Sequence, residues 1–190
     1  MKKENKSIKM LAQAALVAAL AFVVFEFLKI PVSQTTSIHL GNAFVVLGAL
    51  LLGGLWGGLA GAVGLSLGDL LSGYLTSAPK TFILKLVIGL VAGFVAKYLL
   101  HIREKTEEKD QLRIATVSSA VALGLNCILD PIFGYFYKMY ILGQPQELAS
   151  TLAKISSVAT LVNAIACTIL VAIAWPLLYK GLKKANLLVW

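Results

Sequence analysis

The chain has 190 residues, of which 58% are hydrophobic and only 14% are Asp, Glu, Lys or Arg, and its formal net charge is +8. A soluble domain carries about 25% charged residues, so this chain has too few polar side chains to cover a fold in water. The composition excludes a soluble globular enzyme, a disordered chain and a disulfide-stapled secreted protein.

Long stretches without charge predict membrane-spanning segments. No Asp, Glu, Lys or Arg occurs in residues 30–68, 114–129 or 155–179. A helix of about 20 apolar residues crosses a bilayer. We therefore predict an all-α integral membrane protein, a six-transmembrane-helix bundle that forms one domain over residues 1–190. The predicted spans are 8–29, 41–54, 56–75, 79–100, 112–141 and 151–182.

The first predicted span carries small residues at its beginning and a charge pair at its end. Two overlapping pairs spaced four apart are formed by Ala14, Ala15, Ala18 and Ala19. Such a surface permits close helix approach, either inside the bundle or to a helix of another protein. Glu26 and Lys29 are three residues apart, so we expect them to pair or to reach the membrane interface.

The next segments are a polar connection over 30–40 and a short second span, which we expect to be tilted or partly interfacial. Gly53-Gly54 and Gly57-Gly58 predict a tight turn before the third span. In spans three and four, glycines lie on one helical face and predict close internal packing; they are Gly57, Gly61, Gly64, Gly68, Gly89 and Gly93. The long fifth span either extends beyond the bilayer or kinks at Pro131.

The distribution of basic residues predicts the topology. With six spans both termini lie on one side, which then holds twelve Lys and Arg against five on the other. Basic residues accumulate in cytoplasmic loops. We therefore place residues 1–9, 101–111 and 183–190 in the cytoplasm. Because these charges form three short stretches and not one patch, they indicate membrane flanks and no nucleic-acid partner.

Polar residues from several spans map to the outer half of the predicted bundle. An ionisable group inside a membrane is costly and should be paired or functional. We predict a polar, outward-open pocket for a small molecule. Its candidate binding residues are His39, Asn42, Lys85, Asn126, Asp130 and Asn163. The competing interpretation is a structural hydrogen-bond network in which Asp69 or Asp130 neutralises Lys85.

No catalytic signature accompanies these residues. The sequence has no zinc-protease, serine-hydrolase or P-loop motif, and its two histidines are predicted on opposite sides of the membrane. We expect no catalytic residue, no metal site and no cofactor. Without a P-loop the chain cannot itself use ATP, so uphill transport would need an external motor or a coupling ion.

Three segments resemble a known family. They are His39-Leu-Gly-Asn42, Gly68-Asp-Leu-Leu-Ser-Gly-Tyr74, and Pro79-Lys-Thr-Phe-Ile-Leu-Lys85 leading to Gly89 and Gly93. With the size and predicted topology, the chain resembles the substrate-binding S components of energy-coupling factor (ECF) vitamin transporters, especially the group that contains the riboflavin-binding members.

The resemblance implies a six-helix bundle in the bacterial cytoplasmic membrane that captures a vitamin beneath the loop between the first two spans. It implies a transmembrane coupling (T) subunit and two cytoplasmic ATPases as partners. The alanine pairs of the first span resemble the family's contact with the coupling subunit. The bundle is expected to topple within the membrane to release its ligand inside.

The resemblance favours a ligand other than riboflavin. Riboflavin-binding relatives tend to carry a lysine shortly after the asparagine of span six, whereas Asn163 is followed here by Ala164, Ile165 and Ala166. Pyridoxine or hydroxymethylpyrimidine would suit the polar set, with riboflavin as the alternative. The alternatives of a different class are a membrane-embedded enzyme that uses Asp130 and Lys85, and a non-transporting scaffold.

Overall fold

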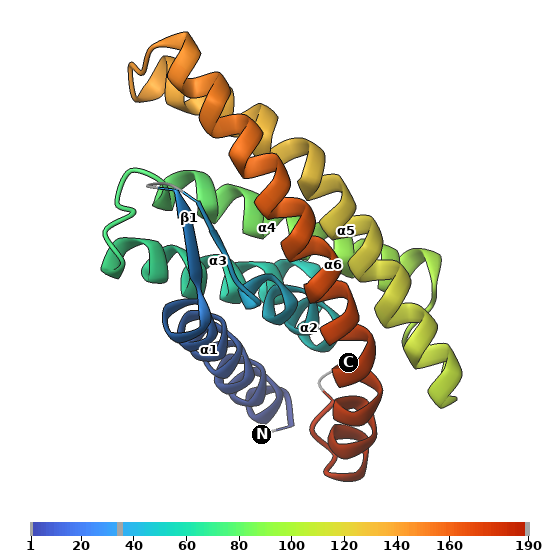
Figure 1. The fold of residues 1–190 in the computed structure, drawn as a ribbon. Helices are drawn as coiled ribbons and strands as arrows, with labels where there is room; N and C mark the ends of the chain where they lie inside the picture. Colours follow the sequence, from blue (N-terminus) through green and yellow to red (C-terminus); the bar gives the residue numbers. More distant parts are fainter. Residues whose placement is uncertain (1, 34–35, 189–190) are drawn as a thin grey trace.

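The computed structural model describes residues 2–33 and 36–188, which form six α-helices and one two-stranded antiparallel hairpin (Figure 1). The helices are α1 (Lys2–Leu28), α2 (Gly41–Leu52), α3 (Gly54–Leu71), α4 (Ala78–Phe94), α5 (Glu108–Phe136) and α6 (Gln146–Lys184). Short π-helical turns, η1 (Val95–Leu99) and η2 (Tyr137–Ile141), extend α4 and α5. The hairpin consists of β1 (Ile30–Ser33) and β2 (Thr36–Ile38).

Five helical segments are long and apolar enough to cross a membrane. They are Ser7–Leu28, Gly54–Leu71, Ala78–Leu99, Glu108–Ile141 and Gln146–Lys184. The sixth apolar helix, α2, has only 12 residues. The chain is therefore an all-α membrane protein apart from the short hairpin, and each predicted span corresponds to a helix with somewhat different ends.

The short helix α2 occupies the centre of the bundle. Ten of its 12 residues are buried, and it packs against α1, α3, α4, α5 and α6. Val45, Val46 and Ala49 are among the least exposed residues of the main core. The expectation that this segment is partly interfacial is thus wrong. The other helices surround it, so it buries its apolar side chains in protein.

Glycines allow the helices around α2 to approach closely, as predicted. A Cβ added at Gly57 would lie 2.2 Å from the backbone of α2, and one at Gly89 would lie 2.2 Å from Cα of Gly58. The predicted turn is shorter than expected. Gly53 alone makes it, with φ of 87°, whereas Gly54 already begins α3. A left-handed φ suits glycine because it has no Cβ.

The predicted polar connection over residues 30–40 folds as the hairpin. Ile30 pairs with Ile38 and Pro31 with Ser37, and both strands pack against α6. In α5 the helix continues through Pro131 as far as Phe136. The helix is therefore not interrupted at that proline.

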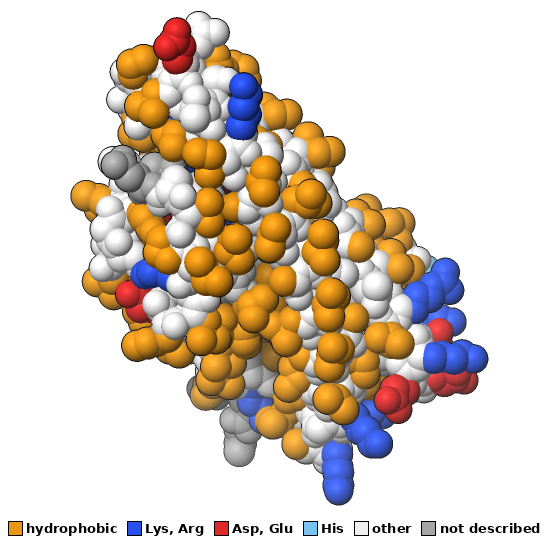
Figure 2. Space-filling model, viewed as in Figure 1, with side chains coloured by type: hydrophobic (Ala, Val, Ile, Leu, Met, Phe, Trp, Pro, Cys, Tyr) orange, Lys and Arg blue, Asp and Glu red, His pale blue; other side chains and the backbone are white. Residues whose placement is uncertain are grey.

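The molecular surface suits lipid on its sides and water at one end. Large hydrophobic side chains cover the face seen in Figure 2, while Lys and Arg gather where α5 begins and α6 ends. α1 begins near the end of α6, because the Gln13 side chain donates a 2.7 Å hydrogen bond to the Leu187 carbonyl. The ion pair predicted at the other end of α1 is confirmed, with 2.9 Å between Lys29 and Glu26.

Candidate functional site

A polar cavity lies beneath the hairpin, away from the end at which α1 begins. It is narrow, with a volume of about 60 Å³. All six residues predicted to bind a small molecule line it: His39, Asn42, Lys85, Asn126, Asp130 and Asn163. The structure thus brings together residues from four helices and the hairpin connection, and their role in binding stays a prediction.

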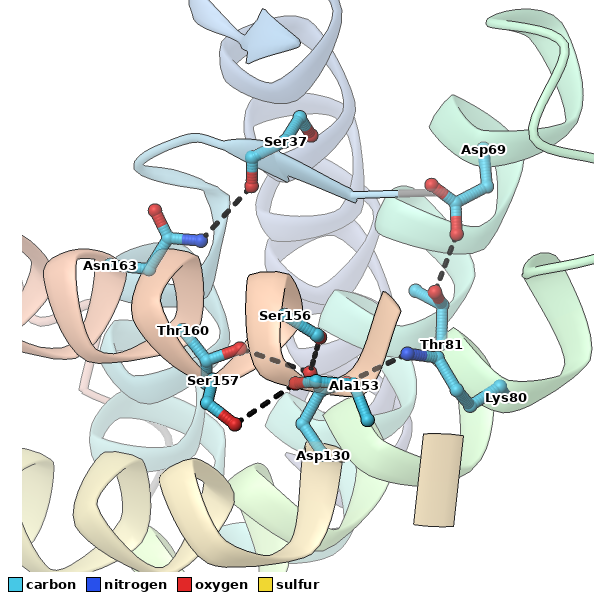
Figure 3. A network of polar contacts seen from close by, with 10 residues as sticks. All are labelled: Ser37, Asp69, Lys80, Thr81, Asp130, Ala153, Ser156, Ser157, Thr160 and Asn163. Carbon is cyan, nitrogen blue, oxygen red and sulfur yellow. Dashed lines mark hydrogen bonds and ion pairs between the residues drawn. The ribbon is translucent and has the colours of Figure 1, made fainter. Parts of the chain in front are cut away.

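Asp130 is the most strongly bonded group in the cavity (Figure 3). One carboxylate oxygen lies 2.8 Å from the ammonium of Lys80, and the other accepts hydrogen bonds from Thr160 at 3.0 Å and from Ser156. In the structural-network interpretation we expected Asp69 or Asp130 to neutralise Lys85. The structure corrects this expectation, because Lys80 forms the ion pair with Asp130 and Asp69 accepts a hydrogen bond from Thr81.

Asn163 holds the hairpin over the cavity. Its side-chain oxygen accepts a 2.9 Å hydrogen bond from the backbone N–H of His39, and its side-chain nitrogen donates to the Ser37 carbonyl at 3.2 Å. Figure 3 shows the second of these contacts. The Asn163 amide therefore connects α6 to β2 and to the residue after it, and it fixes the position of the cavity's cover.

Three polar groups on the cavity wall lack partners among the described residues. The side-chain oxygens of Asn42 and Asn126 are buried and accept no hydrogen bond there. The ammonium of Lys85, a residue only 8% exposed, makes no hydrogen bond or ion pair with the described part of the chain. A buried polar group normally has a partner, so these three groups are suited to bind a ligand.

His39 lies at the edge of the cavity as a neutral imidazole. Burial, together with the positive charge of Lys85, lowers the pKa of His39 to about 3. Its Nδ1 accepts a 3.1 Å hydrogen bond from the backbone N–H of Gly41, so the neutral ring carries its proton on Nε2. The ring also packs edge-on against Phe25, with 4.8 Å between centroids. His39 can therefore donate one hydrogen bond.

Several residues of the cavity were absent from the predicted set. They are Phe25, Thr36, Ser37, Leu65, Asp69, Tyr74, Lys80, Thr81, Ser156 and Thr160. Spacing could have identified some of them, because Ser156, Thr160 and Asn163 share one face of α6 and Thr81 shares a face with Lys85. The hairpin residues gave no such signal.

The structure divides the predicted alanine surface of α1. Ala14 is 8% exposed and packs in a small core with Val17, Leu52 and Ala60. Ala18 packs against the same core, whereas Ala15 and Ala19 are exposed. The sequence left open whether these alanines pack inside the bundle or contact another protein. In the structure Ala14 and Ala18 pack inside the bundle, whereas a partner contact at Ala15 and Ala19 stays a prediction.

No group of three or more His, Cys, Asp or Glu side chains suited to a metal ion occurs in residues 2–33 and 36–188. In a comparison with known families, residues 5–184 match the family described as ECF-type riboflavin transporter, S component. No curated protein and no solved structure matches the chain. The family match covers every residue of the cavity.

Proposed function

The chain belongs to the ECF-type riboflavin transporter S component family, and we propose that its cavity binds a small water-soluble vitamin on the outer side of a bacterial cytoplasmic membrane. The bound vitamin is then delivered for ATP-driven uptake. The members of this family are substrate-binding subunits of transporters, and the family is not an enzyme family, which supports a vitamin-binding role for this chain. The ligand, its binding residues and the membrane orientation are our proposals.

We propose six membrane crossings in one domain of residues 1–190, with both termini in the cytoplasm. Five long apolar helices and the central α2 support this count. The beginning of α1 and the end of α6 are adjacent, and basic side chains gather at that end (Figure 2). Because basic segments favour the cytoplasmic side, the cavity beneath the hairpin then opens to the outside.

The proposed binding site is supported above all by the amide oxygens of Asn42 and Asn126, which have no hydrogen-bond partner among the described residues. Each is buried, lines the cavity and has an unused acceptor. A ligand with hydroxyl or N–H groups would supply the missing donors, which is worth about 1 kcal/mol per hydrogen bond. Lys85 and Asp130 add charge, while His39 and Asn163 position the hairpin above the ligand.

Pyridoxine and hydroxymethylpyrimidine are the favoured ligands. Both are single aromatic rings with hydroxymethyl groups, whose hydroxyls suit the polar side chains of the cavity wall. Phe25 and Tyr74 supply aromatic walls. Riboflavin is the alternative, since it is named in the description of the matched family.

Uptake needs partners that this chain does not contain. S components of this kind work with a transmembrane coupling subunit and ATPases. We propose one coupling subunit and two cytoplasmic ATPases here, with the exposed Ala15 and Ala19 of α1 as part of the contact. A non-transporting scaffold is the remaining alternative, and co-purification without any ATPase would favour it.

Calorimetry on the purified chain tests the binding proposal. Native mass spectrometry first identifies any retained small molecule, and titrations then compare pyridoxine, hydroxymethylpyrimidine and riboflavin. Asn42→Ala and Asn126→Ala should each weaken binding about fivefold, since each removes one hydrogen bond. The control Thr116→Ala lies on the same helix as Asn126 and bonds only its own helix, so it should bind normally. Unchanged affinity in both asparagine variants would overturn the assignment.

A further inference from the structure

Lys85 is a buried lysine on the cavity wall whose side-chain nitrogen makes no hydrogen bond or ion pair with the described residues. It is 8% exposed and lines the cavity wall from α4. No carboxylate of the described residues lies within 4.0 Å of its ammonium. Its neighbour Lys80, equally buried, is paired with Asp130 at 2.8 Å.

The nearby carboxylates are already bonded elsewhere. Asp130 accepts from Lys80, Ser156 and Thr160, which uses both of its oxygens. Asp69 accepts from Thr81 at 2.5 Å through one oxygen. The cavity wall therefore has two aspartates and two lysines, but of these four described residues only Lys80 and Asp130 form an ion pair.

A third buried lysine adds positive charge close by. Lys138 is 3% exposed, makes no ion pair among the described residues, and interacts electrostatically with Lys80 and Asp130. Three buried lysines thus lie near two buried aspartates. An unpaired buried charge is costly in lipid or protein, so an anionic group entering the cavity would be stabilised.

We infer that the ligand presents an anionic oxygen to the ammonium of Lys85. This inference rests on the proposed vitamin-binding function and selects among its candidate ligands. A 3-hydroxypyridine such as pyridoxine carries an acidic ring hydroxyl, which ionises as the ring nitrogen takes up a proton. Hydroxymethylpyrimidine is a neutral aminopyrimidine and has no such oxygen. The cavity is therefore a site for the hydroxypyridine class.

The rest of the wall fits that zwitterion. Asp69 keeps one carboxylate oxygen that no described residue bonds, and this oxygen can accept from the protonated ring nitrogen. The amide oxygens of Asn42 and Asn126 can accept from the two hydroxymethyl groups. The cavity thus offers one partner of the correct charge or polarity to each polar group of the ring.

The test is calorimetric titration of the full purified chain with pyridoxine, its 3-O-methyl ether and hydroxymethylpyrimidine. The ether keeps the ring but cannot form the anionic oxygen. Wild-type protein should bind pyridoxine at least about tenfold more tightly than either of the others, because a hydrogen bond to a charged group is worth about 1.5–3 kcal/mol. Equal binding of the ether or of hydroxymethylpyrimidine overturns the inference and leaves vitamin binding in place.

The variant Lys85→Met removes the ammonium group but keeps an unbranched side chain of similar length, so it tests the charge of Lys85 alone. It should lower pyridoxine affinity at least about tenfold and bring the ether within about threefold of pyridoxine, because the charged partner is gone. Lys154→Met, at an exposed lysine of α6, is the control and should bind as wild type. A tenfold preference that persists in Lys85→Met contradicts the role of Lys85.

Two further outcomes are decisive. If Lys85→Met does not fold, the wild-type comparison of pyridoxine with its ether still decides, and Lys85→Arg should retain the preference because it retains the charge. If none of the three compounds binds and riboflavin does, both the favoured ligands and this inference are wrong, while the transport function stands.

Discussion

Asp130 is the residue on which the buried charges of the cavity depend. Its carboxylate joins Lys80 on α4 to Ser156 and Thr160 on α6. Removing one member of a buried ion pair leaves the other uncompensated, which costs about 3–5 kcal/mol. The three contacts thus connect α4, α5 and α6 around the site, and they orient the Asp130 carboxylate.

We predict that Lys80→Met destabilises the protein by about 3–5 kcal/mol, because Asp130 is left buried without its cation. Chemical unfolding in detergent measures the loss. The partly exposed Glu26–Lys29 pair provides the control, and Lys29→Met there should cost less than about 1 kcal/mol. Equal losses in the two variants would show that burial of the first pair has no energetic role.

His39 gives the protein an acid sensitivity with a defined sign. The pKa is 6.5 for an ordinary histidine and about 3 here. Between pH 6.5 and pH 3 the histidine is protonated in the unfolded chain but not in the folded chain. The free energy of unfolding is therefore highest above the unfolded pKa and falls as the pH is lowered.

We predict that acidification from about pH 7.5 to about pH 5.5 removes roughly 1.4 kcal/mol of unfolding free energy through His39. The variant His39→Gln should not show this decrease, because it has no imidazole to protonate. Denaturant titrations of both proteins at the two pH values measure the free energy of unfolding. Identical pH dependence in both proteins would mean that His39 titrates normally in the folded state.

At the scale of helices, close contact depends on glycine at the crossing of α3 with α2. Gly57 leaves no room for a side chain, because an added Cβ would lie 2.2 Å from the carbonyl carbon of Gly48. Gly124 on α5 has nothing within 4 Å of the same position. The two glycines are thus a matched pair for one substitution.

We predict that Gly57→Ala lowers the free energy of unfolding by about 1–3 kcal/mol or more, since α2 and α3 must separate. Gly124→Ala should be neutral or stabilise the protein by about 0.5–1 kcal/mol, because alanine is the better helix former. Thermal unfolding of both variants in one detergent compares them. A stable Gly57→Ala variant would contradict the α2–α3 packing.

The hairpin is held to α6 through Asn163, and this contact also predicts a measurable effect. Asn163→Ala removes two hydrogen bonds to the hairpin side of the cavity. Amide exchange should rise in residues 36–39 while α2 stays protected, because the two lost hydrogen bonds are worth about 2 kcal/mol. Ligand affinity should also fall, since residues of this segment line the cavity. Unchanged exchange in this segment would show that the hairpin is held by other contacts.

At the scale of the whole molecule, one side of α1 packs against the other helices and the opposite side is exposed. Ala14 packs with Leu52 and Ala60, whereas Ala15 and Ala19 are exposed. Small exposed residues permit a helix of another protein to approach closely in lipid. The cavity begins at Phe25, farther along α1, so docking and ligand binding are separable.

We predict that Ala15→Trp combined with Ala19→Trp abolishes co-purification with the coupling subunit and transport, because the bulky rings block a partner helix. Ligand binding by the isolated chain should be unchanged. Ile173→Trp with Leu177→Trp, on an exposed side of α6, is the control and should assemble normally. Ala14→Trp should instead reduce stability and ligand binding together, since Ala14 is buried.

If the double variant at Ala15 and Ala19 still assembles and transports, that side of α1 faces lipid and the partner binds elsewhere. If it loses ligand binding together with stability, these alanines belong to the core of the bundle. Only loss of assembly with retained binding agrees with a docking surface.

The sequence alone determined the membrane character, the six helical segments and six of the residues that line one cavity, whereas the other ten lining residues were not predicted. Hydrophobic length and helical spacing are local properties, so the spans and the shared face of Asn126 and Asp130 could be predicted. The charge-free stretches and the glycine spacing likewise indicated closely packed helices.

Only the tertiary structure decided which partners these residues take. Lys80 pairs with Asp130, fifty positions away, because the relative rotation and translation of α4 and α5 bring their side chains together. Helix packing also brings Asn163 of α6 to the backbone of His39, next to the hairpin. It likewise determines that Ala14 is buried against α2 and α3 while Ala15 is exposed. Spacing within one helix places a residue on a face, but the packing of several helices determines what that face contacts.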